Sequence, residues 1–205
     1  MYLPPRFFLP LSLLCLFLLL GGCASKNEPR VLLPASVALP HYSTSDKTGI
    51  FSNDSLRVTA TPLSMDNSLR HPLLVRELLK MEHPVFSITI ENLSDKKVIF
   101  NPDFSSATDN RLGFRRPLDH TDLFFLVRSM EGGGKLLKNM KGRFYDLTET
   151  VPPGGRSDKL LIFKPFEEKS TKATLTMQEV YVGDETVQLT FPFLLIVESK
   201  ISPTD

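Results

Sequence analysis

Val85-Phe86-Ser87-Ile88-Thr89-Ile90-Glu91 is the clearest strand signal in the chain. Its apolar and polar residues alternate, so Phe86, Ile88 and Ile90 point to one face and the polar residues to the other. A polar turn over residues 92–96 follows, and Val98-Ile99-Phe100 is the expected returning strand. This region predicts an antiparallel pair of strands that packs one face against a hydrophobic core.

Short strands separated by turn residues extend this pattern along the chain. We expect them at residues 56–60, 123–128, 144–150, 160–163, 173–177, 180–182 and 187–191. The last two flank Gly183-Asp184-Glu185-Thr186, which is a hairpin signal. Pro192 then interrupts the last strand and fits an edge or a bulge. Seven or eight such strands predict a mainly β, antiparallel sandwich.

One segment has the spacing of a helix rather than of a strand. Between Pro72 and Met81, Leu74, Leu78 and Met81 stand at positions i, i+4 and i+7. Pro72 suits the first helical turn, and Pro84 ends the pattern. We expect this helix to pack across one end of the sheets.

Four pieces of the chain resemble the immunoglobulin-like domains of many bacterial lipoproteins. They are a strand ending in Asn92, a strand at residues 123–127, the Pro153-Gly154 turn and the apolar strand at residues 160–163. The resemblance covers about residues 50–198 and implies an immunoglobulin-like β-sandwich. Antibody-type domains differ, because this chain has no Trp and no cysteine pair in that region.

The N-terminus has the pattern of a secretory signal. A single basic residue, Arg6, precedes an apolar stretch of 14 residues from Phe7 to Leu20. A membrane-spanning helix needs about 20 apolar residues, whereas a shorter apolar region followed by small residues indicates a cleaved signal peptide. Leu20-Gly21-Gly22-Cys23 follows directly.

Leu20-Gly21-Gly22-Cys23 resembles the lipobox of bacterial lipoproteins. The resemblance implies that residues 1–22 are removed, that Cys23 is acylated and that this lipid anchor holds the protein on a membrane. Ala24, in place of the Asp that commonly retains such proteins in the inner membrane, implies the outer membrane, facing the periplasm. The alternatives are an ordinary signal peptide with a chance cysteine and an uncleaved anchor.

Residues 23–48 are rich in Pro, Ser and Thr and have no sustained period, so we expect a lipidated tether there. The alternative is that Val31, Leu32 and Leu33 dock on the domain as an edge segment. Residues 49–200 are then the folded domain.

Composition and cysteine content exclude some classes of function. Removing 22 of the 205 residues leaves 183, and because Arg6 is the one charged residue removed, 23 basic and 23 acidic residues remain. This balance argues against nucleic-acid binding, which needs a basic stripe. Cys15 lies in the signal peptide, so with Cys23 acylated no disulfide or thiolate metal site is expected. No cofactor motif occurs either.

Catalytic motifs are mostly absent. There is no nucleophile elbow, zinc-binding helix or phosphate loop. Asp119, His120 and Asp122 are the most suggestive cluster, because a His between carboxylates can act in proton transfer or ligate a metal. The simpler interpretation is a polar turn that enters the next strand.

The stretch from Asn101 to Asp122 is a long connection between expected strands. Within it, Arg111, Phe114, Arg115 and Arg116 combine aromatic and basic side chains, which suits a protein partner surface. The alternative is that Phe104 and Phe114 cap the core while the arginines face water. We therefore expect a non-catalytic binding or assembly module. An envelope hydrolase using Asp119, His120 and Asp122, and a periplasmic chaperone for apolar ligands, are the competing hypotheses.

Overall fold

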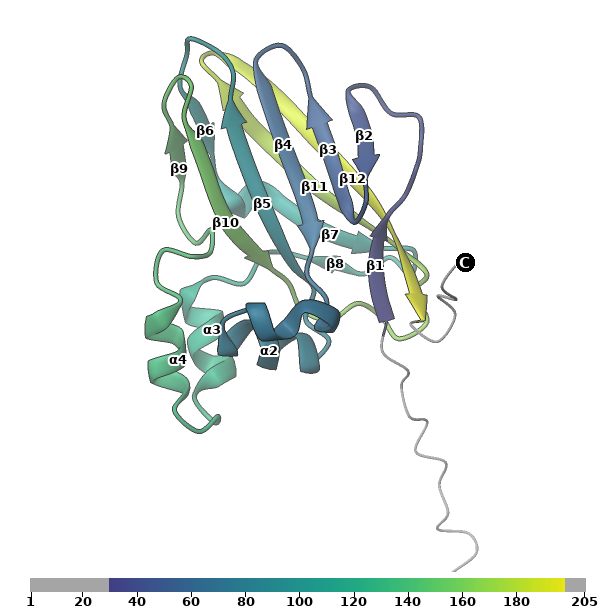
Figure 1. Ribbon diagram of the computed structural model, residues 1–205, viewed down its shortest axis with the longest axis vertical. Coiled ribbons are helices and arrows are strands. Elements are labelled where there is room, and N and C mark those ends of the chain that lie inside the picture. The colour runs from purple at the N-terminus through teal and green to yellow at the C-terminus, as the bar shows by residue number, and fades with distance from the viewer. Residues whose placement is uncertain (1–29, 198–205) are drawn as a thin grey trace, which may run out of the picture.

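The alternating strand β5 (Val85–Asn92) is an interior strand of an antiparallel sheet and pairs with a neighbour on each side. The computed structural model describes residues 30–197, and in this range the chain forms two antiparallel sheets and three short α-helices (Figure 1). In the sheet that contains β5, the strand order is β10 (Arg156–Ile162), β5, β4 (Leu56–Pro62), β3 (Thr48–Ser52) and β2 (Tyr42–Ser45).

The second sheet is built around two long strands. Its main order is β1 (Arg30–Pro34), β12 (Glu185–Val197), β11 (Lys172–Val182), β6 (Val98–Phe100) and β9 (Glu149–Val151). Two further strands extend it, because β7 (Ser105–Asp109) pairs with β11 and β8 (Phe114–Arg115) pairs with β7. The register of the β11–β12 pair shifts between Met177 and Val180, where Glu179 has a positive φ of 52°. This bulge divides β11 into a part that pairs with β7 and a part that pairs with β6.

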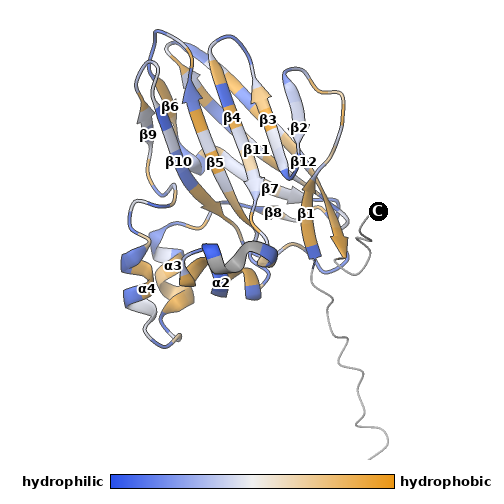
Figure 2. Ribbon diagram, viewed as in Figure 1, coloured by the Kyte–Doolittle hydropathy of each residue, from blue (hydrophilic) through white to orange (hydrophobic). Residues whose placement is uncertain are grey.

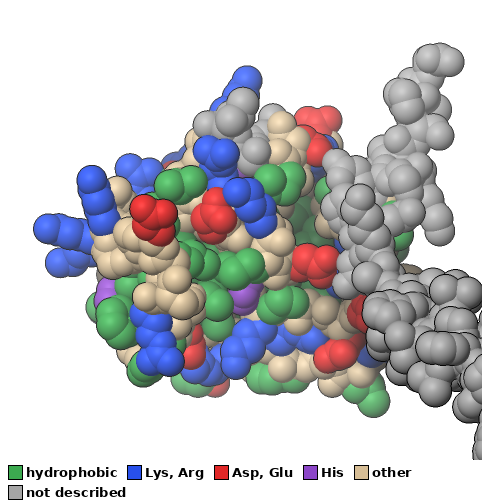
Figure 3. All heavy atoms as spheres, turned by 90° about the horizontal axis from the view of Figure 1, so that it is seen from below, with side chains coloured by type: hydrophobic (Ala, Val, Ile, Leu, Met, Phe, Trp, Pro, Cys, Tyr) green, Lys and Arg blue, Asp and Glu red, His purple; other side chains and the backbone are tan. Residues whose placement is uncertain are grey.

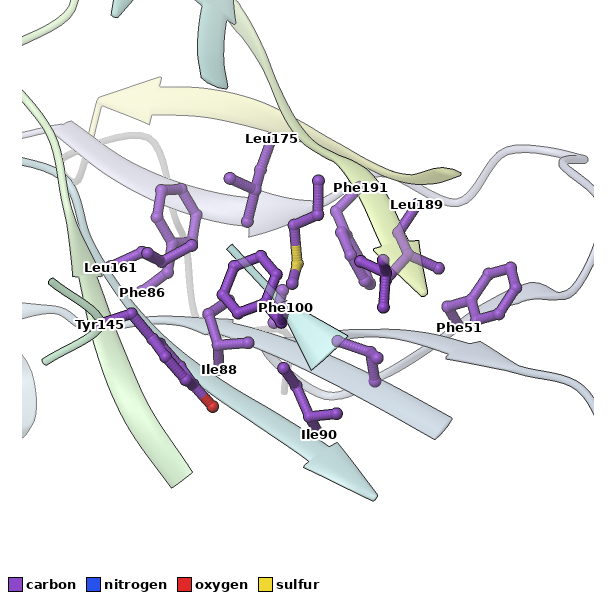
Figure 4. Packing of buried hydrophobic residues seen from close by; sticks show 14 of the residues in the cluster. Phe51, Phe86, Ile88, Ile90, Phe100, Tyr145, Leu161, Leu175, Leu189 and Phe191 are labelled. Carbon is purple, nitrogen blue, oxygen red and sulfur yellow. The ribbon is translucent and has the colours of Figure 1, made fainter. Parts of the chain in front are cut away.

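The two sheets enclose one hydrophobic core (Figure 4). Phe86, Ile88 and Ile90 of β5 are fully buried in it, as their alternation predicts. The Phe86 ring packs edge-on against Phe163, with the two centroids 5.9 Å apart. It is tilted against Phe193, with the centroids 5.1 Å apart. Asn92 at the end of β5 is also buried, and its Nδ2 donates to the carbonyl oxygens of Lys96 at 2.7 Å and Val151 at 3.0 Å.

A layer of helices closes one end of the sheets (Figures 1 and 2). It contains α2 (Leu73–Lys80), α3 (His120–Val127), α4 (Gly133–Asn139) and the 3₁₀ turn η1 (Met65–Arg70). A second 3₁₀ turn, η2 (Pro102–Phe104), lies between β6 and β7. The helices share a second core, whose buried members are Leu74, Val75, Leu78, Val85, Leu118, Leu123, Val127, Leu137, Met140, Phe144 and Ile162. We call the group formed by the three helices α2, α3 and α4 the helical end. The helix expected at residues 72–81 is confirmed as α2.

The strand expected at residues 123–128 is wrong, since these residues lie in and just after α3. The Asp119 side chain accepts a hydrogen bond from the Asp122 amide at 2.8 Å, and the Asp122 side chain accepts one from the Asp119 amide at 3.2 Å. This reciprocal pair is a capping box, which satisfies free amides at the start of a helix. An apolar run without strict alternation fits a helix as well as a strand, and here the cap decides.

A second expected strand is corrected nearby. Gly132, with a φ of 67°, directly precedes α4. Of the strand expected at residues 144–150, Phe144 makes a single bridge to Leu160, and the strand β9 covers 149–151.

The expected tether is shorter than residues 23–48. Arg30–Pro34 pairs with residues 193–197 of β12, and Tyr42–Ser45 pairs with β3. Val31 is buried, and Leu32 packs against the main core. This segment docks as an edge strand instead of a free coil because docking removes its apolar area from water. The folded part thus begins by residue 30 instead of 49, while Cys23 and the lipobox lie outside the described residues. Between residues 30 and 197, no helix has the length and apolar character to cross a bilayer.

Candidate functional site

The stretch between Asn101 and Asp122 is not an open loop. It contains η2, β7, β8 and the first residues of α3. Residues 110–113 form the turn that joins β7 to β8, and we call this turn together with Phe114 the β7–β8 tip. It brings Arg111, Leu112 and Phe114 to the surface.

Asp109 at the end of β7 organises this tip. Its Oδ1 accepts hydrogen bonds from the amides of Arg111 at 2.9 Å and Gly113 at 3.1 Å, and its Oδ2 accepts one from the amide of Glu167 at 3.1 Å. Burial alone would raise the pKa of Asp109, but these three amides and the charge of Arg115 together hold it below its usual value. Asp109 is therefore a carboxylate that fixes the backbone of the tip.

Arg115 is buried and completes this frame. Its Nη1 lies 2.8 Å from Asp109 Oδ2, its Nε donates to the carbonyl oxygen of Pro165 at 2.6 Å, and its guanidinium lies 5.2 Å from the ring centroid of Phe166. Neither partner of the ion pair is accessible, since the Arg115 side chain is 8% exposed and that of Asp109 is 0% exposed. Arg115 therefore supports the tip from beneath and offers almost no surface to a partner.

The apolar residues of the tip face solvent. Leu112 is 96% exposed and Phe114 is 71% exposed. Leu112 also has a φ of 64°, a backbone conformation that costs a residue with a Cβ about 1–2 kcal/mol. Phe114 therefore does not cap the core, and Phe104 is also partly exposed. The expected position of Arg111 and Phe114 on an accessible surface is consistent with this geometry, whereas sequence reasoning missed Leu112.

The Asp119, His120 and Asp122 cluster is the start of α3. Both carboxylates are engaged in the capping box, and Asp122 Oδ2 also lies 2.8 Å from Nη1 of Arg116. His120 is exposed at the first helical position. Arg116 is likewise exposed, and it ion-pairs with the cap instead of belonging to the tip. Across residues 30–197, no three His, Cys, Asp or Glu residues are grouped to hold a metal ion.

A cavity of about 250 Å³ lies beside β1 and α2. Its wall contains His83, whose Nδ1 lies 2.8 Å from the carbonyl oxygen of Phe163 and must therefore carry the donated proton. Burial lowers the pKa of His83, and the charge of Lys164 lowers it further. The hydrogen bond to Phe163 acts in the opposite direction but does not cancel them. Apolar residues and the charged side chains of Arg30, Lys80 and Glu82 share the lining. Sequence reasoning gave no sign of this cavity, because its walls come from distant segments.

The helical end exposes a second apolar surface. Phe124 is 48% exposed and Phe125 is 55% exposed, and their ring centroids lie 5.8 Å apart. The Arg128 guanidinium lies 5.1 Å from the centroid of Phe125. At the same end of the molecule, a groove between α2 and α4 has Arg70, His71 and Arg143 in its wall. Seen from below, this end of the molecule carries a hydrophobic centre with Lys, Arg and some acidic side chains around it (Figure 3).

Comparison with known proteins adds little to these observations. No protein-family model and no curated protein matches the chain. A solved structure, the crystal structure of the yjhA protein from Bacillus subtilis, is 11% identical over 69% of this chain and 93% of that chain, with a TM-score of 0.40. This likeness is too distant to indicate a shared function.

Proposed function

We propose that the protein is a lipid-anchored lipoprotein of the cell envelope whose β domain is a non-catalytic binding module. The β7–β8 tip is its contact for an envelope protein, and Leu112 and Phe114 are the anchoring side chains. Arg111 lies beside them as a hydrogen-bond donor. The observation that carries this proposal is a pair of large apolar residues, 96% and 71% exposed, on a turn that a buried ion pair holds in place.

Physical chemistry favours a protein contact at such a tip. A Phe and a Leu that fill a partner's pocket contribute much of an interface's energy, whereas the surrounding residues contribute little. The amide hydrogen bonds to Asp109 and its ion pair with Arg115 fix the tip before any partner arrives. A turn that is already ordered loses less conformational freedom on binding. The positive φ of Leu112 also fits a functional turn, because strain of this kind persists at sites where the surroundings enforce it.

The anchor rests on the sequence Leu20-Gly21-Gly22-Cys23. Acylation there would concentrate the tip near other envelope proteins, and Ala24 favours delivery to the outer membrane, facing the periplasm. Mass spectrometry of the membrane fraction should find an acylated N-terminus at Cys23. The Cys23→Ala protein should lack this modification, and an unmodified Cys23 in mature wild-type protein would contradict the anchor.

We also propose that the two sheets are a divergent immunoglobulin-like sandwich. The antiparallel order and the buried Asn92 at the end of β5 are compatible with that fold. Strands β7 and β8 and the helical end are additions to it. An experimental structure whose sheets superpose on immunoglobulin-like domains strand by strand would support this assignment, and a different strand order would exclude it.

The binding proposal is tested by capture from envelope extract. The lipidated wild-type protein should retain a specific protein, and Leu112→Ser with Phe114→Ser should weaken this capture at least roughly thirtyfold, because losing even one apolar anchor costs about 2 kcal/mol. Leu93→Ser with Leu147→Ser is the matched control, since both residues are exposed apolar residues elsewhere on the domain. Both double variants should melt like the wild type.

The outcomes separate clearly. Lost capture with unchanged melting in the tip variant supports the proposal. Undiminished capture of a verified partner by the tip variant would exclude the tip as the contact, and equal loss in both variants would indicate nonspecific apolar adhesion.

A further inference from the structure

We propose that the helical end of the anchored protein lies on an anionic phospholipid surface, with Phe124 and Phe125 in the headgroup region. This inference rests on the proposed lipidation at Cys23 and adds an orientation to it: the helices face the membrane, and the opposite end of the sheets points away. Three independent observations lead to it, namely the length of the tether, the exposed apolar side of α3 and the charge of residues 123–143.

The tether is short, and it leaves the domain at the helical end. Cys23 precedes Arg30 by seven residues, which span at most about 25 Å when fully extended. Arg30 is fixed, because its Nη1 donates to the carbonyl oxygens of Glu167 at 2.9 Å and Glu168 at 2.7 Å. Its Nη2 lies 3.6 Å from Oε2 of Glu82, which follows α2. The start of β1 lies at the end of the sheets that carries the helices (Figure 1). An acylated Cys23 therefore keeps this end of the domain close to the bilayer.

Helix α3 is apolar on two sides. Leu123 and Val127 are buried in the second core, whereas Phe124 and Phe125 point to solvent. The described part of the chain leaves about half of each residue uncovered, since Phe124 is 48% exposed and Phe125 is 55% exposed. Arg128 lies over the Phe125 ring, so its charged group can remain at headgroup level while the rings insert. Aromatic residues with adjacent basic residues are typical of helices that rest in a membrane interface.

The charge of this segment complements anionic lipid. Residues 123–143 contain one acidic residue, Glu131, and five basic ones, for a formal charge of +4; the basic residues are Arg128, Lys135, Lys138, Lys141 and Arg143. All five are exposed, and none forms an ion pair within residues 30–197. The groove between α2 and α4, with Arg70, His71 and Arg143 in its wall, can accept a phosphate group.

Composition also distinguishes a membrane from a protein partner. Protein interfaces are depleted of Lys, whereas basic residues near an anionic bilayer each strengthen binding about fivefold. Lys135, Lys138 and Lys141 lie in and directly after α4, the helix that contacts α3. The helical end therefore suits a lipid surface better than it suits a protein surface.

The chain contains no Trp, so a single substituted Trp reports depth in the bilayer. Lipidated Phe125→Trp protein is placed in vesicles of phosphatidylglycerol and phosphatidylethanolamine that contain brominated lipid. Leu93→Trp is the matched control, because Leu93 is 52% exposed and lies in the β5–β6 turn at the other end of the sheets. We expect several-fold stronger quenching at position 125 than at position 93, and loss of the difference in pure phosphatidylcholine vesicles.

A charge test accompanies this measurement. In the Phe125→Trp background, Lys138→Gln with Lys141→Gln should lower the ratio of docked to undocked protein roughly twenty-five-fold, because each basic residue contributes about fivefold. Lys96→Gln with Lys97→Gln, at the far end, should leave the quenching unchanged.

Failure of the anchor and failure of the orientation look different. If mass spectrometry finds no lipid on Cys23, the proposed function loses its anchor. If the protein is lipidated and both Trp positions are quenched equally or not at all, the anchor stands and the docking proposal is overturned. A partner protein that cross-links at position 125, with no quenching of the Trp there by brominated lipid, would also overturn the docking proposal.

Discussion

The β7–β8 tip and the exposed side of α3 both present large apolar residues to solvent, but different forces hold them. Few apolar contacts fix the tip. Its backbone depends on the carboxylate of Asp109 and the buried guanidinium of Arg115. Helix α3 instead rests on the second core through Leu123 and Val127, while its aromatic side stays free. The comparison implies that removing a buried charge should destabilise the tip. Adding a side-chain atom at a close backbone contact should instead destabilise the packing of α3.

The largest expected effect is at the ion pair beneath the tip. Arg115→Met leaves the buried carboxylate of Asp109 without its cation, and such a loss costs about 3–5 kcal/mol of the free energy of unfolding. Arg116→Met removes the neighbouring arginine, whose exposed ion pair with Asp122 contributes at most about 1 kcal/mol. Urea denaturation of both variants measures the difference.

If the two arginine variants lost the same stability, the tip would not depend on a buried ion pair. In that case the contrast with α3 would disappear, because both regions would be held mainly by packing.

A steric change should instead affect the helical end. A Cβ placed on Gly133 would lie 1.9 Å from the carbonyl oxygen of Val127, the last residue of α3, whereas one on Gly134 meets nothing within 4 Å. Backbone must move to accept Gly133→Ala, so we expect a loss of about 1–3 kcal/mol, as for other overpacked sites. Gly134→Ala should be neutral or slightly stabilising, since Ala favours a helix more than Gly does.

Thermal melting of both glycine variants tests this, and capture through the β7–β8 tip should survive in each. A Gly133→Ala protein that melts like Gly134→Ala would mean that α3 and α4 can separate without cost. The membrane proposal would then need a looser helical end than the close contact implies.

Sequence patterns predicted the parts of the fold that local periodicity determines. The alternation in residues 85–91 gave β5 and its buried face, the Gly183-Asp184 turn gave the β11–β12 hairpin, and the spacing of Leu74 and Leu78 gave α2. In each case, the residues that decide the structure are close together in the chain. The antiparallel arrangement followed from the number of short strands and turns.

Parts determined by distant contacts were missed. Residues 30–34 look like a tether, and they become β1 because β12, more than 150 residues later, offers a free edge. Ser105–Asp109 is too polar to predict a buried strand, and it is one because β11 pairs with it. Residues 123–128 were misassigned because the Asp119 and Asp122 capping box was interpreted as a polar turn.

The candidate site was predicted in composition but not in geometry. The aromatic and basic residues of 101–122 were identified, yet their separation into an exposed tip, a buried frame and a helix cap depends on pairings with distant residues. Arg115 is buried because Pro165, Phe166 and Glu167 surround it. Nothing in the spacing of residues 111–116 distinguishes it from Arg111 or Arg116.

The smallest expected effect concerns Leu112 and separates stability from binding at the tip. Its φ of 64° is strained for a leucine, and Asn adopts this conformation more readily without the flexibility of Gly. Because Leu112 is 96% exposed, replacing it removes almost no packing. Leu112→Asn should therefore raise the free energy of unfolding by about 0.5–1 kcal/mol while weakening capture of the envelope partner. Higher stability with weaker capture would show that the protein keeps a strained leucine for its contact with another molecule. A variant with unchanged capture would assign the contact to Phe114 and Arg111 alone, and a less stable variant would mean that Leu112 contributes to the fold of the tip in a way that exposure does not reveal.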